Sequence, residues 1–495
     1  MLESMVHGLG VLLEPGIILY MLMGIMLGIV IGIIPGLTGI VLLSIFIPFT
    51  WNMGQYQALA FLMAGYAVCY TGGSITAILL NIPGTGANSA TLVDGFPMSQ
   101  QGKAGQAIGA ALTASALGGL FGGLVLAAFI PIVRPIVMAF GAPESFFLVV
   151  MGLSFISALS HGNRSKAVFS ALLGLLFSFV GYHASTAFPR YSFGFTYLFD
   201  GIKISTCALA IFAIPEMMDL MLRGGSISKS ESPTTAPVRD IIQGGKEVLR
   251  HWGLFIRCSV IGTIVGAVPG VGSDVSVWVA YGHAKTTSKR SETFGQGNIE
   301  GVIAPESANN AKEGGGLLPT LALGIPGSAA MAILLGAFLI VGIQPGPRFL
   351  VEHLDLAFTI VGALIFSNLF GAFVCMIIST KLIKITQIRA QFLAPVILCV
   401  TALGAYCTRN SVFDVFLMLI MSVLGWALRE LNYSRPSFFL GFILGGLAER
   451  YYSISVQTYG WTFFLTPVSI TIIGLTVFGV ALEPMRVYIK KKKML

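Results

Sequence analysis

The residues in this sequence that could do chemistry are Pro-Gly pairs set inside long apolar runs. Three of the pairs follow an isoleucine, at Pro35-Gly36, Pro83-Gly84 and Pro326-Gly327, and the last two are the ones called the two Ile-Pro-Gly motifs below. Proline lacks an N–H and clashes with the preceding helical turn, so each pair is expected to end one half-helix and begin another. The N-terminus of a half-helix presents unpaired N–H groups and the positive end of the helix dipole. Such a break can bind a carboxylate without arginine or lysine, and the free carbonyls at its other end suit Na⁺.

Small residues surround both breaks. A glycine doublet stands ten residues before each proline, ending at Gly73 and at Gly316, and would allow a second unwound point. Hydroxyl and amide side chains follow the first break and add hydrogen-bond donors without bulk. The alternative is that the prolines and glycines only kink tightly packed helices. The predicted substrate-binding residues are Gly72, Gly73, Ser74, Pro83, Gly84, Thr85, Asn88, Ser89, Gly315, Gly316, Pro326, Gly327 and Ser328.

Acidic and amide side chains near the breaks are the candidates for ion coupling. Acids inside a membrane are functional candidates by default, although the two aspartates equally fit a helix-capping role. The stretch 295–316 is polar between apolar segments. It could line a cavity and bind a cation, or it could be a solvated loop that leads into a helix with Pro305 near its start. The ion-coupling candidates are Asp94, Asp274, Glu306, Asn309 and Asn310.

No enzyme constellation accompanies these residues. The sequence has no G-x-S-x-G, no H-E-x-x-H and no P-loop, and its six histidines are scattered. The six cysteines form no C-x-x-C pair, so a metal site or a bound cofactor is not expected. Without an ATP site, transport would be driven by an ion gradient, of Na⁺ or H⁺, or would run downhill.

The elements that must position these motifs are membrane helices. Hydrophobic residues make up 55% of the 495 residues and charged residues only 10%, far too few for a soluble surface. The net charge of +8 gathers at segment ends, which fits the positive-inside rule and not a nucleic-acid partner. We predict an all-α polytopic protein embedded in a lipid bilayer, with about 11–14 membrane segments, broken helices and re-entrant hairpins.

The chain divides into two halves that repeat the same motifs in the same order. Upstream of the Ile-Pro-Gly motifs, GIVIGIIPGLTG at 28–39 corresponds to GTIVGAVPGVGS at 262–273. We predict a first membrane repeat over 1–222, a cytoplasmic polar linker over 223–251, a second repeat with additional C-terminal helices over 252–483, and a basic cytoplasmic tail over 484–495. Basic loops place the loops after the two Ile-Pro-Gly motifs on opposite sides of the membrane, which predicts inverted repeats.

At these motifs the chain resembles the large membrane subunit (TctA) of the tripartite tricarboxylate transporter family. The resemblance rests on GIIPGLTG, YTGGSITAILLNIPG and FGQGNIEGVIAPESANNAKEGGGLLPTLALGIPGSA, and covers about residues 28–350. It implies a periplasmic substrate-binding protein and a small four-helix membrane subunit as partners, in a bacterial inner membrane. The residues that carry over are Gly72, Gly73, Ser74, Asn81, Pro83, Gly84, Asp94, Glu306, Asn309, Asn310, Gly324, Pro326 and Gly327.

Three functions were weighed on this basis. The first is binding-protein-dependent uptake of di- or tricarboxylates such as citrate, coupled to Na⁺ or H⁺. The second is a stand-alone carboxylate carrier or channel, which would need no binding protein. The third is a membrane-embedded enzyme, which would need a polar catalytic cluster that the sequence lacks. We expect the first.

Overall fold

The structure is a computed structural model, and it describes residues 1–34, 37–154, 164–183, 186, 188–223, 237–268, 273–386 and 390–478. Within these ranges the chain is helical except for loops and one short antiparallel hairpin, in which Gly181 pairs with Arg190. The predicted all-α class is therefore confirmed.

The described residues of the first half begin with a short helix and continue through six longer ones and several shorter elements. Its elements are α1 (Leu2–Val11), α2 (Pro15–Ile33), α3 (Gly39–Phe46), η1 (Ile47–Asn52), α4 (Gln55–Leu80), η2 (Gly86–Asn88), α5 (Ser89–Gln100), α6 (Ala104–Val137), α7 (Ala142–Ser154), α8 (Arg164–Ser178), β1 (Gly181–Tyr182), β2 (Pro189–Arg190), η4 (Thr196–Asp200), α9 (Ile204–Ala208), the π-helical turn η5 (Leu209–Ala213) and α10 (Ile214–Arg223).

The second half has the same kind of elements and a longer C-terminal part. Its elements are α11 (Val238–Arg250), α12 (Trp252–Ala267), α13 (Ser273–Thr287), η6 (Ser291–Thr293), α14 (Glu300–Leu323), α15 (Ala329–Ile340), α16 (Phe349–Glu352), α17 (Leu354–Thr386), α18 (Ala390–Cys407), α19 (Val412–Glu430), α20 (Arg435–Tyr459), η7 (Gly460–Leu465) and a last helix over Pro467–Phe478.

Several helices are suited to a lipid bilayer. Among the described residues, α2, α4, α6, α17 and α19 are long and apolar enough to cross a membrane. Two bent pairs raise this number to seven: α11 with α12, bent by 79°, and α20 with the last helix, bent by 67°. Large apolar side chains also cover the outer faces, for example Leu124, 55% exposed on α6, and Ile420, 69% exposed on α19. The chain is a multi-pass membrane protein, because only lipid tolerates such a surface.

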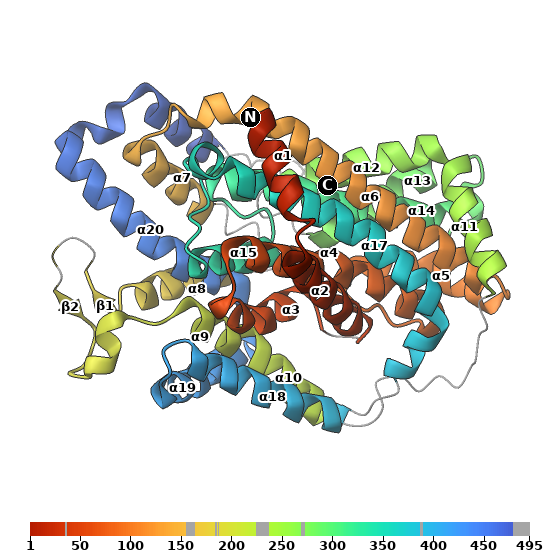
Figure 1. The fold of residues 1–495 in the computed structure, drawn as a ribbon, viewed down its shortest axis with the longest axis horizontal. Coiled ribbons are helices and arrows are strands. Elements are labelled where there is room, and N and C mark those ends of the chain that lie inside the picture. Colours follow the sequence, from red (N-terminus) through yellow and green to blue (C-terminus); the bar gives the residue numbers. More distant parts are fainter. Residues whose placement is uncertain are drawn as a thin grey trace, which may run out of the picture.

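The helices form an elongated body in which α4 lies near the middle, and α14 lies toward the end formed by α11 to α13 (Figure 1). The pair α7 and α20 lies at the other end, while α10, α18 and α19 gather along one edge. Helix α6 packs against both α14 and α11.

The two halves repeat one packing arrangement. Helix α2 packs on α4, and α12 packs on α14. In the first pair Gly28 and Gly32 lie against the backbone of α4, and in the second Gly262 and Gly266 lie against the backbone of α14, with no room for a Cβ at any of the four. Glycines four residues apart let helix backbones approach closely in membranes. The repeat read from the motifs therefore has a structural counterpart, and its inverted orientation in the membrane stays a prediction.

Some segment boundaries differ from those that hydropathy indicates. The apolar run 314–341 is two helices, and the first of them, α14, already begins at Glu300. The predicted linker 223–251 contains α11, whose apolar Ile241 and Val248 are buried; residues 224–236 lie outside the described residues. In both places neighbouring helices cover the segment. A hydropathy profile is calculated along the sequence alone, so it takes no account of such neighbours.

Candidate functional site

Both Ile-Pro-Gly motifs end a long central helix. Helix α4 ends at Asn81, with φ 57°, and α14 ends at Gly324, with φ 70°. These left-handed C-caps lie two residues before the prolines, and asparagine and glycine are the residues that adopt this conformation most readily. The chain then passes through the proline into a new helix, α5 or α15. The predicted helix breaks are confirmed.

The glycine after each proline folds back onto the helix pair of its own half. Gly84 lies against the carbonyl of Gly32 and the Cα of Gly73, and its N–H donates to the Gly73 carbonyl at 3.4 Å. Gly327 takes the equivalent position against Gly266 and Gly316. In both halves, the glycine after the proline therefore lies beside the glycine doublet of the long helix that has just ended.

The glycine doublets do not unwind the helices. Helix α4 runs without interruption past Gly72 and Gly73, and α14 runs past Gly315 and Gly316. A second unwound point at the doublets was the wrong interpretation. Gly72 instead lies beside the carbonyl of Ile29, and Gly315 beside the equivalent carbonyl in α12. Glycine is required at the doublets because the backbone of a neighbouring helix passes too close to them for a larger residue.

A buried amide organises the first break. The Nδ2 group of Asn88 donates to the carbonyl of Tyr70 at 3.0 Å and to Ser74 Oγ at 3.0 Å. Its Oδ1 accepts from the hydroxyl of Thr85 at 2.7 Å and from the Thr85 N–H at 3.3 Å. Asn88 therefore ties the start of α5 to the middle of α4.

The same amide reaches the second half of the chain. Asn88 Nδ2 lies 3.4 Å from Glu306 Oε1 on α14. Glu306 also accepts from Thr91 Oγ1 at 2.5 Å and from Ser115 Oγ at 2.7 Å, and it is fully buried. The carboxylate is satisfied by neutral donors from α5 and α6. From Gly301 onward the polar stretch is buried within α14, whereas Gly295 and Gln296 lie exposed in the loop before the helix.

Two further polar groups of α14 face the tyrosines of α4. Lys312 is 3% exposed, and its Nζ donates to Asn309 Oδ1 at 2.6 Å. The ammonium also lies 4.1 Å from the centroid of the Tyr70 ring, a cation–π distance. A positive charge is thus held inside the protein beside an amide oxygen and the face of a tyrosine ring.

Another face of α14 contacts α4 and α17. Asn310 Nδ2 donates to Thr71 Oγ1 at 2.9 Å and to Asn368 Oδ1 at 2.5 Å. Its Oδ1 has no hydrogen-bond partner, and neither has either carboxylate oxygen of Glu313. Both residues are fully buried. These oxygens are the least satisfied polar atoms in this part of the structure.

The second break meets the first through α4. Ser328 caps α15, accepting from the N–H of Met331 at 3.3 Å, and it is a hydrogen-bond partner of the Tyr66 hydroxyl. Tyr66 also pairs with Tyr70, whose hydroxyl lies beside Gly39, just after the Pro-Gly pair at 35–36. Both halves therefore converge on two buried tyrosines of one helix.

Family comparisons agree with this arrangement. A model of the tripartite tricarboxylate transporter TctA family matches residues 18–440. The chain belongs to the TctA family. It is therefore the large membrane subunit of a tripartite tricarboxylate transporter, and the matched region includes both broken helices and every polar residue described above.

Two curated relatives of this TctA-family chain come from Agrobacterium vitis. One, an uncharacterised 52.8 kDa protein in the TAR-I ttuC' 3' region, is 31% identical over 91% of this chain and 89% of its own length. The other, an uncharacterised protein in the TAR-II ttuC' 3' region, is 32% identical over 43% of this chain and 90% of its own length. No solved structure matches.

The acidic candidate nearest the first break has its own set of partners in this TctA-family chain. Asp94 is fully buried, and its Oδ1 accepts from the N–H groups of Gly295, Gly297 and Asn298 at 2.8–3.0 Å. Its Oδ2 accepts from the Tyr281 hydroxyl at 2.9 Å. These bonds fasten the loop before α14, and an ion-coupling role for Asp94 stays a prediction.

The remaining candidates lie at the edge of this network. Ser89 starts α5, donates to the carbonyl of Gly86 and accepts from Trp278 Nε1 at 3.1 Å. Asp274 belongs to the first turn of α13, but its side chain lies outside the described residues. Its role in ion coupling stays a prediction as well.

Sequence reasoning overlooked four residues at the centre. Each lies one or two helical turns from a residue that the sequence did predict, and each buries a polar group in the same region. They are Tyr66, Tyr70, Lys312 and Glu313. A signal was available, because Lys312 and Glu313 are charged residues directly before a glycine run in an apolar chain.

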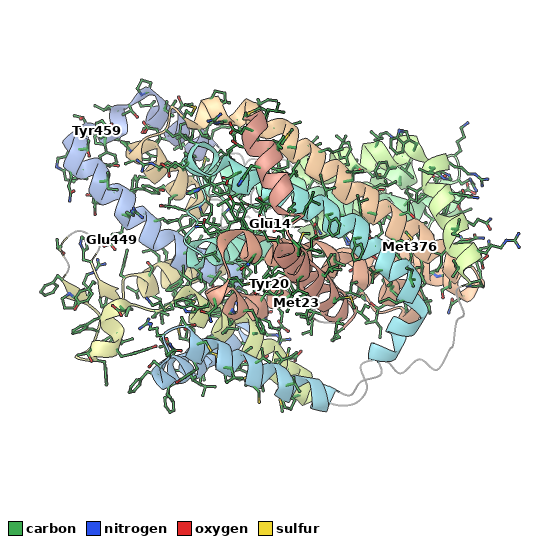
Figure 2. All side chains as sticks on the ribbon, in the orientation of Figure 1. Glu14, Tyr20, Met23, Met376, Glu449 and Tyr459 are labelled. Atoms are coloured by element: carbon green, nitrogen blue, oxygen red, sulfur yellow. The ribbon has the colours of Figure 1, made fainter. Side chains whose placement is uncertain are left out.

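Two cavities lie away from the breaks. One of about 550 Å³ is lined by Phe146, His183 and Glu449 among others; Glu449 lies on α20 beside the β hairpin, where it pairs with Arg190 at 2.7 Å (Figure 2). Another of about 340 Å³ includes Lys103 and Arg290. Neither of these two cavities is lined by a predicted site residue.

Proposed function

We propose that this chain carries di- or tricarboxylates, citrate-like in size and charge, across a bacterial inner membrane, driven by a gradient of Na⁺ or H⁺. A periplasmic binding protein would deliver the substrate, and a small four-helix membrane subunit would accompany the chain. Membership of the TctA family supports both partners. The C-terminus is proposed to lie in the cytoplasm.

The observation that carries the proposal is the convergence of the two breaks on α4. Ser328, at the N-terminus of α15, is a partner of Tyr66, and Lys312 lies over the ring of Tyr70. A helix N-terminus and a buried ammonium both favour an anion. A substrate with two or three carboxylates would bind here with one group at the α15 start and another near the start of α5.

Lys312 adds a charge that the breaks alone lack. A backbone break binds any carboxylate through N–H groups, whereas an ammonium adds a full positive charge in a medium of low dielectric constant. One of its contacts is with the neutral Asn309, and a substrate carboxylate could join that contact. This arrangement favours polyanions over neutral solutes.

Reconstitution tests the proposal. The purified chain would be placed in liposomes with its two partners and an inward Na⁺ or H⁺ gradient, and uptake of a panel of labelled di- and tricarboxylates would be measured. Gradient-dependent uptake of one panel member supports the proposal. If no carboxylate accumulates under either gradient, the proposed substrate class is wrong.

The same experiment distinguishes the second candidate, a stand-alone carrier or channel, from binding-protein-dependent uptake. Its support is that the anion-binding features described above all lie within this one chain. Uptake by the chain without the binding protein would favour it, and strict dependence on the binding protein would exclude it.

A further inference from the structure

The buried charges of α14 do not balance. Three ionisable side chains lie within two turns of each other: Glu306, Lys312 and Glu313, each at most 3% exposed. Two are acids and one is a base, so the ionised set carries one surplus negative charge. A substrate carboxylate brought into this region would add to the imbalance.

The surplus is located at Glu313. Glu306 accepts hydrogen bonds from three side chains, so its charge is stabilised where it lies. Neither oxygen of Glu313 accepts a hydrogen bond of ordinary length and angle, although the Asn368 side chain approaches them. A buried carboxylate without donors is strongly disfavoured unless another positive group contacts it.

A third oxygen without a partner lies one helical turn away. Asn310 and Glu313 are three residues apart on α14, so their side chains are neighbours on one face. Asn310 Oδ1 is also unsatisfied, whereas its Nδ2 is fixed by Thr71 and Asn368. Turning the amide would set its oxygen against Asn368 Oδ1, which is itself an acceptor, so the present orientation is the one that keeps that bond.

The surroundings supply little that could neutralise the acid. Lys312, on the same helix, is directed to Asn309 and Tyr70, and Tyr66 and Cys69 on α4 are the titratable groups that face Glu313 from the neighbouring helix. Asn368 approaches it from α17. Among the unsatisfied side-chain atoms of Asn309, Asn310 and Glu313, three are oxygens and only one, Asn309 Nδ2, is a donor.

We propose that the oxygens of Glu313 and Asn310 bind Na⁺, and that this ion is the one whose gradient drives uptake. Hard cations take several oxygen ligands at once, whereas one proton satisfies fewer of these orphaned atoms. The ion would cancel the surplus charge of α14, so that the anionic substrate binds favourably only when the ion is present. The proposal rests on the proposed transport function and assigns its coupling ion.

Direct binding of radioactive sodium to the full-length purified chain tests the site without any substrate. The variants are Glu313→Gln, which keeps the shape and removes the charge, and Glu313→Asp, which keeps the charge. Glu300→Gln is the matched control, because Glu300 starts the same helix and its described partner is His251, far from the orphaned oxygens. Thermal unfolding in NaCl and in KCl at equal ionic strength gives a second readout.

We expect wild type and Glu300→Gln to bind Na⁺ equally and to unfold at a higher temperature in NaCl than in KCl. Glu313→Gln should bind Na⁺ at least about tenfold more weakly, lose the salt-specific shift and be the more stable protein in KCl. Glu313→Asp should retain part of the binding, which shows that a fold defect does not explain the loss.

The opposite results overturn the inference. It fails if the wild-type protein binds no Na⁺, or if Glu313→Gln binds Na⁺ as tightly as the wild-type protein does. It also fails if uptake proceeds on a proton gradient without Na⁺. If Na⁺ binding depends on Glu313 while no carboxylate is taken up in liposomes, the cation site stands and the proposed substrate class fails instead.

Discussion

Replacing Asn88 by the residue that the second half uses at the same place is the sharpest test of the first break. Asn88 follows Pro83 by five residues, and Met331 follows Pro326 by five. Asn88 Oδ1 lies against Gly73, and the Met331 side chain lies 3.5 Å from a Cβ built at Gly316. The variant Asn88→Met therefore places in the first half the side chain that the second half carries at the equivalent position.

The magnitude follows from the hydrogen bonds. Asn88 takes part in five, one of them with the Glu306 carboxylate. The amide has only two N–H groups for its three acceptors, so the loss amounts to two donated bonds, one of them to a charge, and two accepted bonds. At roughly 1 kcal/mol for a neutral bond and about 2 kcal/mol for the one to a charge, this costs about 5 kcal/mol. Burial of the methionine returns about 2 kcal/mol. We expect a net destabilisation of about 3 kcal/mol, a fall in Tm of roughly 3 °C for a chain of this length.

Asn88→Met should lower the transport rate by more than its loss of stability would explain. Loss of the donor to Glu306 leaves that carboxylate less well held at the junction of the two halves, and about 2 kcal/mol corresponds to more than a tenfold change in an equilibrium. We expect uptake in liposomes to drop at least about tenfold while the protein remains folded by size-exclusion chromatography and thermal unfolding.

The control is Met331→Leu, a volume-conserving change at the equivalent position, for which about 1 kcal/mol is expected. If Asn88→Met retains wild-type Tm and uptake, the polar network is not needed at the first break. If Met331→Leu loses as much uptake as Asn88→Met, the loss arises from packing and the reasoning from hydrogen bonds is refuted.

Three other predictions concern the same network. Pro83→Ala and Pro326→Ala should lower uptake more than they lower Tm, because a continuous helix removes the free N–H groups; equal losses of both would argue against a binding role. Asp94→Asn should lower Tm by about 2 °C, since charge-assisted bonds to the loop before α14 become neutral, yet leave Na⁺ binding at its wild-type level, which radioactive sodium would check. Lys312→Met should abolish carboxylate uptake without weakening Na⁺ binding, and uptake by this variant would remove Lys312 from the substrate site.

The helix breaks and the repeat could be predicted from sequence because their causes are local. At both breaks a proline follows a residue that readily adopts the left-handed cap, Asn81 or Gly324, and this combination ends the helix. Proline alone does not do so, since Pro305 and Pro319 lie inside α14. Composition settles the membrane class in the same way, since 10% charged residues cannot cover a soluble surface.

The start of α14 and the role of Glu313 could not be predicted because their causes are distant in the chain. Whether a polar residue is solvated or buried depends on partners such as Ser115 on α6 and Asn368 on α17, which no local pattern names. The unsatisfied oxygens of Glu313 are a property of the packed structure alone. The glycine doublets misled for the same reason, because close packing and unwinding call for the same residue.

The asymmetry between the halves explains how a symmetric scaffold could couple two different solutes. Equivalent positions carry Asn88 in one half and Met331 in the other, and the middle of α4 carries tyrosines where α14 carries charges. The tyrosines and Lys312 offer donors to an anion, while Glu313 and Asn310 offer oxygens to a cation. Under the proposed function, each solute would lower the electrostatic cost of binding the other because all of these groups lie where α4 and α14 meet, and such coupling is reciprocal.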